Sequence, residues 1–176
     1  MNRWSVCFCL LILLLAGPGC FNGSEPSISN EIRRLKAASD KDAREECAAL
    51  HKKVSSMNPS QVGEGKQLRI EIFELYSYAS TPSFESKVGE SHAAALRSVI
   101  RLLFPGGQAG DSHLTLLGLQ GGSSWAKSDA FERLALYPSL VDEEEEICRF
   151  LPKVKPTEIT ADHWRSIQQK CNALLW

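Results

Sequence analysis

Apolar residues recur at intervals of three and four along most of the chain, which is the spacing of one face of an α-helix. Ala43, Cys47, Leu50, Val54 and Met57, for example, step by four, three, four and three. The pattern predicts an all-α fold, a single bundle of about six or seven short-to-medium helices. The expected helices cover residues 28–57 with one break, 67–79, 83–104, 125–137, 140–151 and the chain from about 160 onward.

Polar capping residues and prolines divide these helices. Ser39 lies where two apolar stripes fall out of phase and is suited to cap a new helix, so we expect a kink or break there. In Asn58-Pro59 and Thr81-Pro82, a residue that caps helices well precedes a proline at the first helical position. Each pair therefore predicts a helix start.

Other boundaries are less sharply defined by the pattern. The first part of 67–79 also alternates between apolar and charged residues, as strands do, but the longer stripe favours a helix. Residues 83–104 predict one continuous helix with His92 on its apolar face. The glycine-rich stretches 105–112 and 121–123 predict loops.

The first 19 residues are typical of an export signal. One positive charge, Arg3, precedes the apolar residues 5–16, and Gly17-Pro18-Gly19 then breaks the helix before Cys20. A dozen apolar residues are fewer than the roughly 20 that span a bilayer. We therefore expect a signal peptide that is removed.

Gly19-Cys20 resembles the end of a bacterial lipobox, with Gly17 where that motif usually has leucine. The resemblance implies lipid on Cys20 and an anchor in the membrane. Simple cleavage before Cys20 is the alternative, because small residues also stand three and one positions before the cut. The expected organisation is a signal peptide at 1–19, a polar tether at 20–30 and a helical domain at 31–176.

Four cysteines remain after Cys20 becomes the first residue: Cys20, Cys47, Cys148 and Cys171. Cys148 and Cys171 both fall on predicted apolar helix faces, and an exported compartment permits disulfides, so we expect these two to pair. Lipid on Cys20 then leaves Cys47 as a free thiol. If Cys20 carries no lipid, two disulfides are possible.

The charge balance narrows the class of partner. Lys and Arg number 20 against 21 Asp and Glu, and the chain after Gly19 has a net charge of −2. Without a basic excess, we expect no nucleic-acid partner. The stretch 31–54 resembles one unit of HEAT-type helical repeats, which leaves a repeat array as an alternative architecture.

The sequence predicts no catalytic residue, no cofactor and no metal site. The acidic run Asp142–Glu146 is best placed in the first turns of the helix at 140–151, with Asp142 as its cap. Asp111, Ser112 and His113 are the residue types of a hydrolase triad. Triad members meet in space rather than in sequence, so their adjacency is not evidence for one.

A binding site is most plausible on loops, since loops carry function more often than cores. We expect stretches 105–113 and 121–125 to meet near Trp125, with Asp111 and His113 as further candidates.

Three functions follow from these features. The first is an exported, lipid-anchored envelope protein that binds a partner protein or has a structural role without catalysis. The second is a freely secreted helical ligand with two disulfides, which the glycosylation sequon Asn22-Gly23-Ser24 also fits. The third is an exported enzyme whose site assembles from dispersed residues such as His92, Asp111, His113 and His163.

Overall fold

Helices account for the ordered secondary structure of the chain, as the hydrophobic pattern predicts. The computed structural model describes residues 27–107 and 109–174; the predicted signal peptide, Cys20 and most of the tether lie outside them. The helices are α1 (Ile28–Ala37), α2 (Asp40–Ser55), α3 (Pro59–Glu64), α4 (Lys66–Ala79), α5 (Pro82–Val88), α6 (Glu90–Arg101), α7 (Ala109–Gly121), α8 (Ser124–Leu136), α9 (Leu140–Glu143), α10 (Ile147–Phe150) and α11 (Ala161–Leu174).

Local capping explains where the N-terminal helices begin. The Ser39 side chain accepts a hydrogen bond from the backbone of Asp42, which starts α2 at the expected break. Asn58 and Thr81 accept from backbone N–H groups in the first turns of α3 and α5, each with proline at the first helical position. These three predicted starts are confirmed. Helix α1 begins at Ile28, three residues before the expected domain boundary.

Helix α4 decides the ambiguity at 67–79. Ile72, Leu75 and Tyr76 are fully buried, as on a helical face, whereas Ile70 is half exposed. A strand would have placed Ile70 and Ile72 on the same side. The helix prediction is confirmed.

The expected single helix at 83–104 is wrong, because Gly89 separates α5 from α6. Its φ of 88° and ψ of 147° interrupt the helical backbone. The apolar face is re-phased after this break: Ala93 and Leu96 are buried, while His92, expected on the apolar face, is exposed. The break also raises the number of helices above the six or seven expected.

The region 105–151 differs from expectation at two further places. Helix α7 begins at Ala109, inside the predicted loop. The expected helix at 140–151 is two short helices, α9 and α10, separated at 144–146. Asp142 lies within α9 and does not cap it, and Glu146 before α10 makes no capping hydrogen bond through its side chain.

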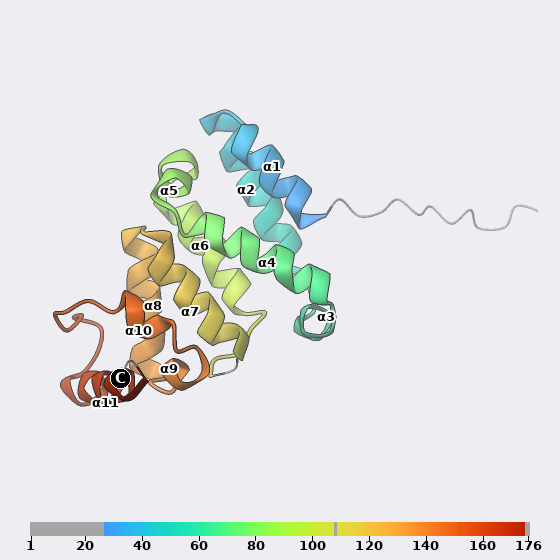
Figure 1. The fold of residues 1–176 in the computed structure, drawn as a ribbon. Helices are drawn as coiled ribbons and strands as arrows, with labels where there is room; N and C mark the ends of the chain where they lie inside the picture. The colour runs from blue at the N-terminus through green and yellow to red at the C-terminus, as the bar shows by residue number, and fades with distance from the viewer. Residues whose placement is uncertain (1–26, 108, 175–176) are drawn as a thin grey trace, which may run out of the picture.

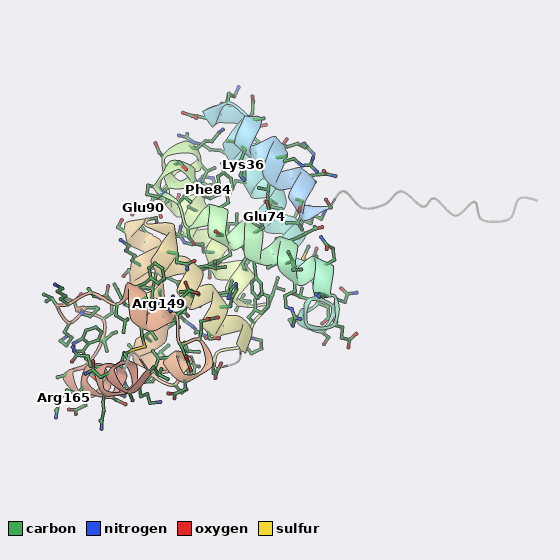
Figure 2. The ribbon with its side chains drawn as sticks, in the orientation of Figure 1. Lys36, Glu74, Phe84, Glu90, Arg149 and Arg165 are labelled. Carbon is green, nitrogen blue, oxygen red and sulfur yellow. A yellow bond between two sulfur atoms is a disulfide. The ribbon has the colours of Figure 1, made fainter. Side chains whose placement is uncertain are left out.

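Among the described residues, two apolar cores share α7. This helix lies between α4 and α8 (Figure 1). The N-terminal core contains the buried apolar side chains of α1–α6 together with Leu103, Phe104 and Leu114. The C-terminal core contains Leu116 and Leu119 of α7 with the apolar side chains of α8–α11 and Ile159. In Figure 2, Lys36 and Phe84 mark helices of the first region, and Arg149 and Arg165 mark helices of the second.

Gly121 lets the end of α7 approach the turn between α4 and α5. A Cβ atom at Gly121 would lie 2.5 Å from the backbone oxygen of Ser80. The backbone N–H of Ser123 donates to that same oxygen at 3.2 Å. The second predicted glycine-rich loop is thus a close-packed junction between the two regions.

None of the helices within the described residues has the length and apolar content needed to cross a bilayer.

Candidate functional site

The two stretches expected to form a binding loop cluster lie at opposite ends of α7. Asp111 and His113 belong to its first turns, while Trp125 follows its last residue and lies in the first turn of α8. Since α7 has 13 residues, at about 1.5 Å per residue these ends are separated by roughly 20 Å. The expectation that the stretches meet is therefore wrong.

Asp111 instead anchors a buried ionic network. It is fully buried, and Arg101 Nη1 donates to its Oδ1 at 2.6 Å. Arg133 Nη2 donates to Oδ2 at 2.7 Å, and the backbone N–H of Gly107 reaches the same oxygen at 3.3 Å. One carboxylate on α7 thereby holds an arginine from α6 and another from α8.

Asp129 on α8 is the second acceptor of Arg101. Its Oδ2 accepts from Arg101 Nε at 2.6 Å and from the Tyr76 hydroxyl at 2.8 Å. Burial, together with the Asp129 charge, raises the pKa of Tyr76 well above its usual value, so this phenol stays protonated and donates. Burial lowers the pKa of Arg101, but electrostatic interactions with Tyr76, Asp129 and Asp111 outweigh burial and raise it.

Arg97 extends the network one turn earlier on α6. It is 3% exposed and donates through Nη1 to the Ala79 backbone oxygen at 2.7 Å and to Glu85 Oε1 at 3.0 Å. The Ser123 hydroxyl donates to the same Glu85 oxygen and also accepts from the backbone of Ala126, which caps α8. Glu85 thus links α5, α6 and the start of α8.

The network is electrically balanced. We call it the arginine network: Arg97, Arg101 and Arg133 with Glu85, Asp111 and Asp129. Three cations face three carboxylates, so no net charge is buried. Its members come from four helices, α5 to α8, and removing one of them would leave an uncompensated charge in a region of low polarity.

A cleft lies beside this network, between α6 and α8. Its volume is about 160 Å³, and Arg97 and Asp129 of the network line it. Trp125 is 47% exposed and lines both this cleft and a second hollow of about 250 Å³. We call the first of these the α6–α8 cleft; it is also lined by Ser98, Ser128 and Glu132.

Glu132 differs from the other carboxylates of the cleft. It is exposed, and within the described part of the chain it forms no ion pair or hydrogen bond. Asp129 is already held by Arg101 and Tyr76. The cleft therefore offers one uncompensated negative charge next to an exposed indole ring.

The residues named for dispersed catalysis do not converge through any contact that the structure records. The His113 ring packs against Phe73 with the centroids 4.6 Å apart and the planes tilted by 60°, and its Nδ1 lies 3.2 Å from Glu144 Oε2. His163 Nδ1 lies 2.7 Å from the Ala135 backbone oxygen. Because Asp111 faces Arg101 and Arg133, it does not orient either imidazole.

The acidic run at 142–146 serves to join helices. Asp142 pairs with Lys170 of α11, and Glu144 pairs with His113 of α7. Only part of this run is the solvated helix start that the sequence suggested.

The expected pairing of Cys148 with Cys171 is confirmed: they form a disulfide with their Cα atoms 5.3 Å apart. Cys20 lies outside the described residues. Cys47 is a free thiol, 1% exposed, and burial raises its pKa to about 11. This thiol is protonated and shielded at neutral pH, so it does not act as a nucleophile.

Compared with models of known protein families, with curated proteins and with solved structures, the chain gives no match. Among the described residues, no three His, Cys, Asp or Glu side chains are grouped to hold a metal ion. The candidate site, the α6–α8 cleft, is therefore described only from the positions and contacts of the residues that line it.

Sequence reasoning missed the arginines of α6. Once Gly89 re-phases the helix, the buried stripe contains Leu96 and Ile100, and Arg97 and Arg101 lie immediately beside it at helical spacing. Two arginines four residues apart on a buried face would have predicted internal carboxylate partners. Assuming one continuous helix concealed that signal.

Proposed function

We propose that this chain is an exported, lipid-anchored envelope protein that binds a partner protein through the α6–α8 cleft, without catalysis. The observation that carries the binding role is the exposed Trp125 ring beside the unpaired Glu132 carboxylate. Exposed tryptophans next to partly enclosed hollows are characteristic of residues that contribute most to binding energy. The arginine network below holds the two helices in fixed register.

The cysteine arrangement supports export. Disulfides persist in oxidising compartments, and the Cys148–Cys171 bridge is compatible with such a location. Cys47 is 1% exposed within the N-terminal core, and among the described residues it has no disulfide partner.

Two variants test the anchor. Cells expressing the protein are fed an alkyne-tagged fatty acid, and the purified protein is assayed for covalent label. The wild-type chain and Cys47→Ser should incorporate label, whereas Cys20→Ser should not, since only Cys20 carries lipid. Equal label in Cys20→Ser, or none in the wild type, would contradict the anchor.

Site-specific photo-crosslinking tests the binding role. A photoreactive amino acid at position 98, which lines the cleft and leaves Trp125 and Glu132 in place, should give a discrete crosslinked species in intact cells. The same probe at the exposed position 45 on α2 should not give that species. Identical patterns from both positions would contradict partner binding through this face.

A further inference from the structure

The charges around the α6–α8 cleft do not cancel once the arginine network has been paired. Arg97 is matched by Glu85, and Asp129 is matched within the network. Glu132 remains: of the two carboxylates that line the cleft, it is the one without an ion pair or hydrogen bond among the described residues. Ser128, which also lines the cleft, donates through its hydroxyl to Glu158 Oε1 at 2.8 Å. The cleft therefore favours a positively charged occupant.

Glu158 is ionised under ordinary conditions. Partial desolvation opposes its charge, but hydrogen bonds from its own backbone N–H, Ser128 and Thr157 outweigh that effect and lower its pKa. The neighbouring Lys155 donates to the backbone oxygens of Pro156 and Ile159, at 2.8 and 2.7 Å, and its positive charge also lowers the pKa of Glu158. Glu158 is therefore partly compensated, and the unpaired carboxylate of the cleft is Glu132.

The indole ring of Trp125 supplies the second feature that favours a cation. The protein places its own cations over aromatic rings three times: Arg101 over Tyr76 at 5.3 Å, Arg133 over Tyr137 and Lys36 over Tyr78, both at 4.9 Å. In the described part of the chain no cation occupies the face of Trp125, although tryptophan is the best ring for this contact.

We propose that the α6–α8 cleft binds a basic side chain, lysine or arginine, presented by the partner protein, with Trp125 stacking on it and Glu132 pairing with it. This rests on the proposed function. A volume of about 160 Å³ suits one such side chain rather than a drug-sized molecule, for which pockets of about 300–1,000 Å³ are usual.

The test is a titration of the purified full-length mature protein with Nα-acetyl-arginine amide. The readout is the indole N–H resonance of Trp125 in a ¹H–¹⁵N spectrum, assigned with Trp125→Phe. Nα-acetyl-citrulline amide has nearly the same shape without the charge. We expect saturable, salt-sensitive binding of the arginine compound in the millimolar range and no saturation with citrulline.

Two charge-removing variants locate the contact. Glu132→Gln should weaken arginine-amide binding about threefold to fivefold, as expected for a lost exposed ion pair. Glu143→Gln removes the same charge from α9 and should leave the affinity unchanged. Glu132 is exposed, so its substitution should not alter folding; an unchanged thermal unfolding curve verifies this.

Equal binding of the two amides, no binding of either, or equal effects of the two variants would overturn the basic-side-chain proposal. The partner-binding proposal is tested separately. If crosslinking from position 98 persists while the arginine compound fails to bind, the cleft binds a partner by other chemistry. If both fail, both proposals fall.

Discussion

The N-terminal and C-terminal cores stabilise their helices by different means. The N-terminal core uses helices as long as 16 residues, four of them started by side-chain caps at Ser27, Ser39, Asn58 and Thr81, and it retains a free thiol at Cys47. The C-terminal core includes two helices of four residues that have no side-chain cap, and a disulfide joins α10 to α11.

This difference shows that the length of the helices in each region decides what is needed to stabilise them. Long capped helices bury continuous apolar stripes, so packing alone can hold them. Helices of one turn cannot bury much apolar area each, and a covalent link limits the freedom of the chain that connects them. The arginine network lies between the regions, where α6, α7 and α8 meet, and binds them to each other.

The largest effect is expected at this junction. Asp111→Ala leaves Arg101 and Arg133 without their shared carboxylate and should lower the free energy of unfolding by about 3–5 kcal/mol. Denaturant unfolding measures the loss. Glu46→Ala removes a carboxylate from an exposed pair with Arg34 and should lower it by less than about 1 kcal/mol. Similar losses in the two variants would mean that the buried network stabilises the fold no more than an exposed ion pair does.

Removing the disulfide should affect mainly the C-terminal core. The double substitution of Cys148 and Cys171 by serine opens a loop with a sequence separation of 23 residues and should lower stability by roughly 3 kcal/mol. Amide hydrogen exchange should show lost protection in α9–α11 while α1–α4 stay protected. An equal loss of exchange protection in both cores would contradict the view that the disulfide stabilises only the C-terminal core.

Alanine substitutions at two glycines of the N-terminal region separate the effect of backbone strain on stability from the effect of helix propensity. Gly89→Ala should destabilise by about 2 kcal/mol, because a φ of 88° with a ψ of 147° is strained for alanine, although the added Cβ would lie no closer than 4.0 Å to its nearest neighbour, His92 Nδ1. Gly63→Ala, within α3 and with nothing within 4 Å of the added Cβ, should be neutral or stabilise by up to about 1 kcal/mol. Equal melting temperatures for the two variants would refute the assigned break at Gly89.

The smallest predicted effect is a loss of stability in alkali. The raised pKa of Cys47 means that its thiol keeps its proton in the folded state after the unfolded state has lost it. Its contribution is present below pH 9 and should disappear as pH rises toward about 11. Cys47→Ala should reduce the fall in urea midpoint over this range. The bridged pair, Cys148 and Cys171, does not titrate and contributes no such effect.

Local signals predicted most of the N-terminal fold, because caps and apolar stripes act within a few residues. Ser39, Asn58 and Thr81 specify helix starts through hydrogen bonds to their own first turns. Gly89 was missed, since the apolar spacing continues across it and only its backbone angles reveal the break. The split at 144–146 was missed because contacts of Asp142 and Glu144 with distant helices replace capping.

The candidate site was less accessible to sequence reasoning. Trp125 was named, but its neighbours come from α6, more than twenty residues earlier in the chain. The sequence analysis placed Asp111 in a binding loop, whereas the structure places it in a helix, where it forms a buried ion pair with Arg101. Pairing of Arg101 with Asp129 depends on how helices cross, which no spacing within one segment encodes.

The most direct test is the intact mass of the mature protein from its native host, with alkylation under denaturing conditions before and after reduction. We predict a chain that starts at Cys20 and is heavier by a diacylglycerol and a fatty acid. One alkyl group, on Cys47, should add before reduction, and three in total after it. A mass equal to the bare chain, with no alkylation before reduction and four groups after it, would contradict the lipid anchor and show a second disulfide.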